Sequence, residues 1–298
     1  MKLYLFIALL WGLPLGSVWA ELRVFACEPE WAALAGELGG EQLEVHSATT
    51  AYQDPHRIEA RPSLIAKLRK ADLLICSGAE LEQGWLPLLL RKAGNAKVQP
   101  GQPGHVMAAE HVSRLDLPQV LDRSMGDVHG AGNPHVHFDP RRIAEVATLL
   151  NDRLQQLDGE ASEYYQQRYE QFMVRWQSAI IEWQQLALPL KGVRVVVYHK
   201  DWRYLFDWLG IEQAATLEPK PGIAPSASHL ALITSQLAEN PARMVIYNSY
   251  QPERAARWLS RQANIPALQL PYTVGGSEKS VDLFSLFDEI ITKLLAAL

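Results

Sequence analysis

The chain has 298 residues, which is long enough for one large domain or two domains of medium size. Hydrophobic residues make up 48% of the sequence and charged residues 20%, a balance typical of soluble globular proteins. The formal net charge of -5 is modest and no block of like charge stands out, so the composition argues against a nucleic-acid-binding protein.

Residues 1–20 have the features of a secretory signal peptide. Lys2 supplies a short positive segment, residues 3–15 form an almost unbroken apolar run, and residues 18–20 offer a small-x-small cleavage site. A membrane anchor is the alternative, but the apolar run is shorter than the roughly 20 residues that a span needs. We therefore predict that the signal peptide is removed before Glu21 and that the mature protein is exported.

In the first part of the mature chain, short apolar runs alternate with helical patterns. The predicted strands are residues 22–27, 43–46 and 72–77, and the predicted helices include residues 31–38 and 62–70. This alternation favours parallel strands joined by helical crossovers. Residues 99–133 are rich in Gly, Pro and His and lack periodicity, so we expect a loop region there.

The middle of the chain holds no strand pattern. Asp139 and Pro140 are typical of a helix start, and Asp158-Gly159 interrupts the helical pattern. From residue 160 to 188, apolar and aromatic residues recur at helical spacing, which predicts a helix of nearly thirty residues. Such a helix would be about 42 Å long and can cross a pair of domains. We interpret its aromatic residues as core packing.

The last part of the chain repeats the pattern of the first. The predicted strands are residues 193–198, 244–247 and 267–270, and the predicted helices are residues 226–239, 252–263 and 281–295. We predict an α/β fold with two lobes of parallel sheet flanked by helices, joined by one long rigid backbone helix. The expected parts are an N-terminal lobe over 21–150, a linking helix over 151–188 and a C-terminal lobe over 189–298.

The two cysteines, Cys27 and Cys76, each end a mostly apolar run. If those runs are neighbouring parallel strands, the two thiols lie within bridging distance in an oxidising compartment. Two buried free thiols are the alternative. Their separation of 49 residues does not fit a paired metal-binding motif.

Three of the nine histidines fall where ligands commonly bind. His56 and His199 follow predicted strands, and His135 precedes a predicted helix start. In open α/β sheets this edge holds ligands, and neutral imidazole is a common ligand of zinc. Pro55 and Pro134 stiffen two of these loops. Spacing alone is a weak argument, because most single histidines are surface or hydrogen-bonding residues.

The motifs around these histidines resemble those of the metal-specific solute-binding proteins of ABC transporters, the zinc and manganese uptake group. The matching segments are Asp54-Pro55-His56 with Arg61-Pro62-Ser63, residues 71–82, Asn133-Pro134-His135 through Asp139-Pro140, residues 198–205, Ala224-Pro225-Ser226, and Val274-Gly275-Gly276-Ser277. The resemblance covers essentially the whole mature chain. It implies a periplasmic protein that holds one metal ion between two lobes with His56, His135 and His199. The expected partner is the permease of an ABC importer in the inner membrane, and we expect a monomer.

The fourth ligand departs from that group, whose members often carry an acid in the loop before the Gly-Gly-Ser segment. Here residues 270–274 contain no acid, and Tyr272 falls near the expected place. Four candidates stay open at this point: water, Glu278, Asp282 and His129. We do not expect His137 to be a ligand, because His135 already occupies the motif position. Asp201 either orients a ligand histidine or is exposed.

Histidine at all three recognisable positions favours zinc over manganese, which suits oxygen ligands. We predict that Zn²⁺ is transported cargo and that the protein is not an enzyme. One alternative is a secreted zinc-dependent hydrolase with a three-histidine site, although no His-Glu-x-x-His or Gly-x-Ser-x-Gly motif is present. Another is a protein of the same fold that binds Mn²⁺ or a further divalent metal, or an adhesin.

Overall fold

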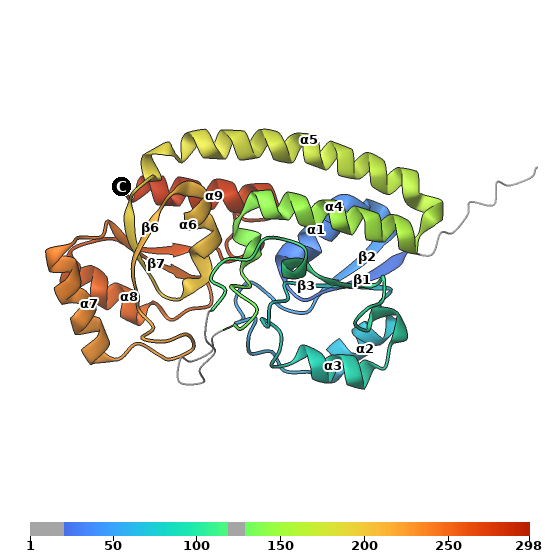
Figure 1. Cartoon of the computed structure of the whole chain (residues 1–298), viewed down its shortest axis with the longest axis horizontal. Helices are drawn as coiled ribbons and strands as arrows, with labels where there is room; N and C mark the ends of the chain where they lie inside the picture. Colours follow the sequence, from blue (N-terminus) through green and yellow to red (C-terminus); the bar gives the residue numbers. More distant parts are fainter. Residues whose placement is uncertain (1–20, 119–128) are drawn as a thin grey trace, which may run out of the picture.

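The computed structural model describes residues 21–118 and 129–298, so the predicted signal peptide lies outside the described residues. Figure 1 shows two groups of α/β elements beside each other, with the long helix α5 (Ser162–Leu186) running along both. We call the elements up to Leu157 the N-terminal lobe and those from Arg194 onward the C-terminal lobe. The predicted fold class, two lobes of parallel sheet flanked by helices and joined by a long helix, is confirmed.

The N-terminal lobe contains a four-stranded sheet of order β2-β1-β3-β4, in which every pair is parallel. The strands are β1 (Leu22–Ala26), β2 (Leu43–Ser47), β3 (Leu73–Cys76) and β4 (His105–Met107). The first three were predicted. The prediction of a loop at β4 was wrong, because a strand of three residues is too short to show a period.

Helices cover both faces of this sheet. They are α1 (Pro29–Gly39), α2 (Pro62–Lys70), α3 (Leu86–Ala93) and α4 (Pro140–Leu157). Successive strand residues point to opposite faces, so Val24 packs in the core with α1 and α4, whereas Phe25 packs with α2 and α3. Burial on both faces explains why these strands read as continuous apolar runs.

The C-terminal lobe repeats this architecture with a parallel sheet of order β6-β5-β7-β8. The strands are β5 (Arg194–Val197), β6 (Glu212–Thr216), β7 (Met244–Asn248) and β8 (Ala267–Leu270), and the helices are α6 (Arg203–Leu209), α7 (Ala227–Glu239), α8 (Glu253–Ala263) and α9 (Leu283–Ala296). Helices α7 and α8 cover one face, and α6 and α9 the other. Strand β6 was not predicted, because this partly exposed edge strand has no apolar run.

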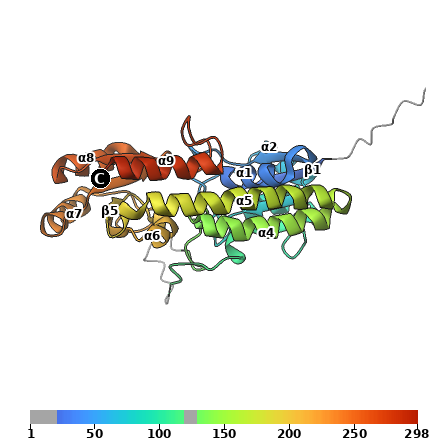
Figure 2. The same ribbon diagram turned by 90° about the horizontal axis from the view of Figure 1, so that it is seen from above.

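Helix α5 packs against both lobes. It has 25 residues, about 38 Å of helix, and lies beside α1 and α4 at one end and α9 at the other (Figure 2). Its buried aromatic residues are core residues, as predicted. Helix α4 ends at Leu157, and Asp158 separates it from the turn that leads into α5. Residues 151–157, which we predicted to be part of the linking helix, therefore belong to α4. Among the described helices, none combines the length and apolar character needed to cross a membrane.

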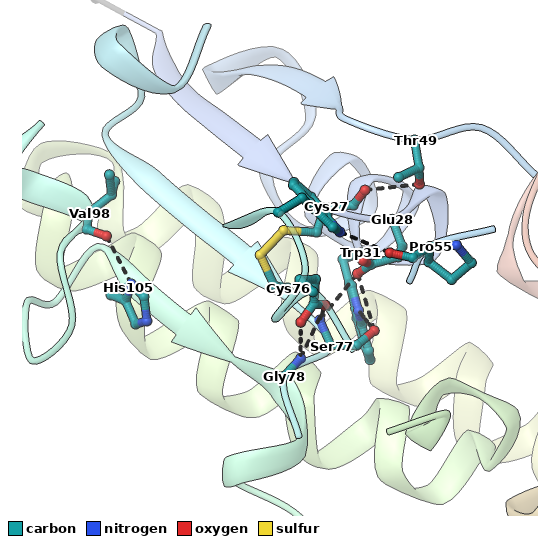
Figure 3. The surroundings of a disulfide bond; sticks show 12 residues. Cys27, Glu28, Trp31, Thr49, Pro55, Cys76, Ser77, Gly78, Val98 and His105 are labelled. Atoms are coloured by element: carbon teal, nitrogen blue, oxygen red, sulfur yellow. Dashed lines mark hydrogen bonds between the residues drawn. A yellow bond between two sulfur atoms is a disulfide. The ribbon is translucent and has the colours of Figure 1, made fainter. Parts of the chain in front are cut away.

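Cys27 and Cys76 form a disulfide at the carboxyl ends of β1 and β3 (Figure 3). The two strands are hydrogen-bonded neighbours, which brings the two Cα atoms to 4.8 Å, within the usual range. Of the two alternatives that the sequence left open, a bridge or two buried free thiols, the structure has the bridge. Thr49 Oγ1 also donates a hydrogen bond to the Cys27 carbonyl oxygen at 2.9 Å, so the loop after β2 is tied to the same corner.

We expect the double variant Cys27→Ala, Cys76→Ala to be less stable by about 2–4 kcal/mol, because the bridge closes a long loop and restricts the unfolded chain. Urea unfolding of the variant and of the oxidised protein measures the difference. The wild-type protein with its disulfide reduced serves as the control, since it keeps both side chains. A loss below about 0.5 kcal/mol in both would contradict the expectation.

Two buried carboxyl groups lie next to the disulfide. Glu28 Oε2 accepts a hydrogen bond from Ser77 Oγ at 3.1 Å, and Glu82 Oε1 accepts one from the Ser77 N–H at 2.8 Å. Burial, followed by the charges of Glu82 and Glu30, raises the pKa of Glu28 well above its usual value. Burial likewise raises the pKa of Glu82 to about 7, against the opposing hydrogen bonds from Glu28, Ser77 and Gly78.

This raised pKa predicts a pH dependence of stability. Glu82 has an ordinary pKa of 4.5 and a folded value of about 7, so the folded chain holds more protons than the unfolded chain between these values. The stabilisation is complete below about pH 4.5 and is lost as the pH rises through about 7. We expect the metal-free protein to lose on the order of 2 kcal/mol between pH 5 and 8 from this group.

Urea unfolding midpoints of the metal-free protein at pH 5, 6, 7 and 8 test this expectation. The midpoint should fall less steeply with pH in Glu82→Gln than in the wild-type protein. The exposed Glu239→Gln is the control and should keep the wild-type slope. Because the charge of Glu82 also raises the pKa of Glu28, the difference between Glu82→Gln and wild type reports the titration of this coupled pair. An unchanged slope in Glu82→Gln would show that this carboxyl does not titrate in the range.

Candidate metal centre

The three predicted histidines come from three loops and meet between the lobes. His56 lies between β2 and α2, His135 immediately precedes the short helix at Val136–Phe138, and His199 follows β5. Their ring centroids form a nearly equilateral triangle with sides of 5.7, 5.8 and 5.8 Å. One ligand nitrogen from each ring lies within 4.8 Å of the other two. The structure therefore brings together all three side chains.

Two of the three loops use the same local turn. The Asp54 carboxylate accepts a hydrogen bond from the His56 N–H at 3.0 Å, and the Asn133 side-chain oxygen accepts one from the His135 N–H at 3.0 Å. In each case a proline stands between the two residues. The short polar side chain and the fixed φ angle of proline together define the turn. Both histidines are thus held before any ion arrives.

Each ring has a hydrogen-bond partner at Nδ1. His56 Nδ1 lies 2.7 Å from Asp54 Oδ1, and His199 Nδ1 lies 2.7 Å from Glu218 Oε2. His135 Nδ1 lies 2.9 Å from the Tyr272 hydroxyl. A ring that donates its Nδ1 proton to such an acceptor has a lone pair at Nε2 and a fixed rotation. Because Nδ1 is engaged in each ring, Nε2 is the nitrogen that each ring offers to a cation.

The site is deep on one side and open on the other. His135 is 1% exposed, whereas the side chains of His56 and His199 are 17% and 12% exposed. A cavity of about 220 Å³ opens beside the two more exposed rings, and Asp54, Glu218 and Tyr250 also line it. The two carboxylates on this side favour the approach of a cation.

The protonation of the rings follows their surroundings. Burial, and then the positive charge of the neighbouring histidines, lowers the pKa of His135 well below its usual value. Burial would also lower the pKa of His199, but the carboxylates of Asp201 and Glu218 outweigh it and raise the value to about 9. At neutral pH His135 is therefore uncharged, whereas His199 carries a proton that a cation binding to it would displace.

The candidates for a fourth ligand lie in different places. His129 Nε2 is 3.2 Å from His56 Nε2, with the two rings stacked. Glu278 is exposed, and Asp282 caps α9 by accepting a hydrogen bond from the Ser285 N–H at 2.7 Å. Neither acid shares an interaction with the three rings among those described. His137 faces elsewhere, with Nδ1 3.2 Å from a Glu30 carboxylate oxygen.

Sequence reasoning missed the positions of two acids. Asp201 is fully buried rather than exposed, and its Oδ1 lies 3.6 Å from His135 Nε2 and 3.7 Å from His199 Nε2. Glu218 was not singled out, because it follows strand β6, which gave no pattern of its own. The place of Asp201 two residues after His199 was visible, but whether it points inward depends on tertiary packing.

The chain is similar to proteins of metal uptake. The family model described as "Zinc-uptake complex component A periplasmic" matches residues 24–297. The manganese ABC transporter substrate-binding lipoprotein PsaA of Streptococcus pneumoniae is 21% identical over 283 residues, which cover 91% of this chain and 88% of that protein. The high-affinity zinc uptake system protein ZnuA of Yersinia pestis is 24% identical over 63% of each chain.

A solved structure shares the fold. The structure described as "Crystal structure of ZnuA" superimposes with a TM-score of 0.78 at 20% identity, covering 93% of this chain and 99% of that one. The family model spans most of the 298 residues, and this agreement confirms the resemblance seen in the histidine motifs. The chain therefore belongs to the family of the periplasmic component A of zinc-uptake complexes, the metal-specific solute-binding proteins of ABC transporters.

Proposed function

We propose that this protein captures one zinc ion between its lobes with His56, His135 and His199 and delivers it to an ABC importer. One observation carries the proposal: three imidazoles from separate loops hold their ligand nitrogens within 4.8 Å of one another, while each Nδ1 has a partner. Isolated surface or core histidines have no reason to converge in this way. The transport role comes from the family, whose named members include substrate-binding proteins of ABC transporters.

The choice of zinc over manganese rests on the donor atoms. Three nitrogens suit zinc, whereas manganese prefers carboxylate, carbonyl and water oxygens. Relatives named for each metal exist, so the family alone does not decide, and the imidazole count of this chain supports zinc.

We propose a carrier rather than a hydrolase with the same three ligands. The two carboxylates on the open side, Asp54 and Glu218, hold the Nδ1 atoms of His56 and His199. Both are engaged in orienting ligands, which leaves them poorly suited to act as a general base for a bound water. The ion is thus cargo, and the site is built to bind and release it.

The site also suggests how binding stabilises the closed arrangement of the lobes. His56 and His135 belong to the N-terminal lobe and His199 to the C-terminal lobe, so the ion cross-links them. Asn133 Nδ2 donates to the Lys200 carbonyl oxygen at 2.9 Å beside the site. Because α5 packs on both lobes, we propose that uptake and release use small loop movements rather than wide rotation.

We further propose that the protein works as a monomer in the periplasm, beside the permease of its importer. The family description places its members there, and the Cys27–Cys76 disulfide fits an oxidising compartment. Zinc titration of the exported protein from a periplasmic extract tests the location together with the activity.

The central test is the removal of one ligand. We expect wild-type mature protein to bind one zinc ion, and His135→Ala to bind it at least about 100-fold more weakly, since loss of a ligand exceeds the 10–100-fold effect of losing a supporting group. Titration against a competing chelator measures the affinity. The exposed His111→Ala is the matched control and should behave as wild type.

Growth in zinc-depleted medium tests the biological role. A strain that carries alanine at His56, His135 and His199 should grow no better than a strain without the protein. Normal growth would favour an adhesin or structural role. Equal competition by manganese in the titration would contradict the zinc assignment, and turnover of ester, peptide or phosphate substrates by the zinc-loaded protein would favour a hydrolase.

Glu218 should tune the affinity through His199. Replacement by Gln keeps an acceptor for Nδ1 but removes the charge that strengthens the ring as a ligand. We expect Glu218→Gln to lower zinc affinity by about 10-fold, with one ion still bound, as for other carboxylates behind metal-binding histidines. The same chelator competition measures it, with Glu239→Gln as control. Identical affinities for the two variants would assign no role to this carboxylate.

A further inference from the structure

The carboxylate of Asp201 lies at the closed, inner side of the three histidines. We propose that Asp201 is the fourth protein ligand of the ion, an inference that rests on the zinc-binding function proposed above. It would make the site a closed set of three imidazoles and one carboxylate.

The first argument is the partner pattern of the two carboxylate oxygens. Asp201 Oδ2 accepts hydrogen bonds from Asn248 Nδ2 at 2.6 Å and from Gln251 Nε2 at 2.9 Å. Asp201 Oδ1 is equally buried but has no hydrogen-bond donor within reach. Its nearest charged neighbour without an ion is the His199 ring, whose Nε2 lies 3.7 Å away, beyond hydrogen-bonding distance. A buried carboxylate oxygen that accepts no hydrogen bond is costly, because it has lost the hydrogen bonds it made to water. A cation at this oxygen removes that cost.

The second argument is distance. The unpartnered Oδ1 is the atom that lies 3.6 Å from His135 Nε2 and 3.7 Å from His199 Nε2. His135 Nε2 is itself buried without a hydrogen-bond partner. Tetrahedral zinc with bonds of about 2.0–2.2 Å separates its ligand atoms by roughly 3.4 Å. The two distances from Asp201 Oδ1 are therefore within a few tenths of an ångström of those around one tetrahedral ion. The group whose ligand atoms all lie within 4.8 Å of one another contains the three histidines without Asp201, so His56 has to move toward the carboxylate to complete a set of four ligands.

The third argument is that the carboxylate is held in this orientation. Gln251 Oε1 accepts the Asn248 N–H at 2.9 Å, and Asn248 Oδ1 accepts the Tyr250 N–H at 3.3 Å. Each backbone donor fixes one amide, so that its NH₂ group faces Asp201. Both amides then point donors at Oδ2, which leaves Oδ1 directed at the histidines. The two amide donors thus hold the carboxylate in the orientation that a ligand of the ion requires.

His129 is the competing candidate, and it is less well prepared. It approaches from the side of His56, and its Nδ1 is buried without a partner. Because His56 Nε2 carries a lone pair, the 3.2 Å contact places the proton of His129 on its Nε2, so His129 has to change tautomer before that nitrogen can bind an ion. Asp201 also supplies a negative charge, which three neutral imidazoles lack and a divalent ion requires in a buried site.

The test compares Asp201→Asn with His129→Ala. Asparagine keeps the shape of the side chain but removes the charge, so we expect zinc affinity to fall at least 10-fold in Asp201→Asn, with one ion still bound. We expect His129→Ala to stay within about 2-fold of wild type. The visible spectrum of the cobalt-loaded protein supplies a second readout, because its ligand-field bands report the donor set itself. They should change in Asp201→Asn and not in the exposed control Glu239→Gln.

A crystal structure of zinc-loaded wild-type protein keeps the inference testable even if Asp201→Asn does not fold. It should place Asp201 Oδ1 at 2.0–2.2 Å from the ion. A zinc–oxygen distance above 3 Å, or a wild-type spectrum in Asp201→Asn together with a loss of affinity in His129→Ala, would overturn the role of Asp201 alone. Wild-type protein that binds no zinc would overturn the proposed function.

Discussion

Hydrogen bonds to the Nδ1 atoms of three histidines are the constraint on which this site depends. Each bond fixes the rotation of one ring, and the carboxylates of Asp54 and Glu218 also hold the proton of their ring on Nδ1, so Nε2 is directed toward a common point. Asp54 lies beside its own histidine, but Glu218 and Tyr272 come from the C-terminal lobe. Tyr272 supports His135, which belongs to the other lobe. The ligand geometry is therefore correct only when the two lobes meet in one arrangement.

Packing along α5 holds the lobes in that arrangement. Trp176 donates its indole N–H to the Pro140 carbonyl oxygen at 2.8 Å, at the start of α4 in the N-terminal lobe. Trp183, two turns later, donates to Asp288 on α9 in the C-terminal lobe at 2.6 Å. One face of one helix thus binds both lobes with buried aromatic residues and directed hydrogen bonds. Such a connection resists rotation, which leaves the loops as the parts free to adjust around an ion.

The sequence predicts the elements that carry local signals. The turn at Asp54 and the turn at Asn133 place a polar residue, a proline and a histidine in order, and the same arrangement appears in the structure. Strands that are buried on both faces were equally easy to predict, because they form continuous apolar runs in the sequence. Strands β4 and β6 were not, because one is too short and the other too exposed to show a pattern. Asp201 and Glu218 depend on how β6 and β7 pack beside β5, which no local spacing records.

The sequence motifs led us to expect an acid near Tyr272, but residues 270–274 contain none. In the site proposed here, the carboxylate comes instead from Asp201, on the turn that also carries His199. A tetrahedral ion needs ligand atoms at the correct distances and a suitable total charge, and any loop that reaches the ion can supply them. The location still has a consequence. His199 and Asp201 form a preformed pair on one turn, whereas Tyr272 only orients His135. Movement of the 270–274 loop would take the Tyr272 hydroxyl away from His135 and so weaken the hold on one proposed ligand, while the other proposed ligands stay in place. Such a weakening suits a protein that has to release its ion.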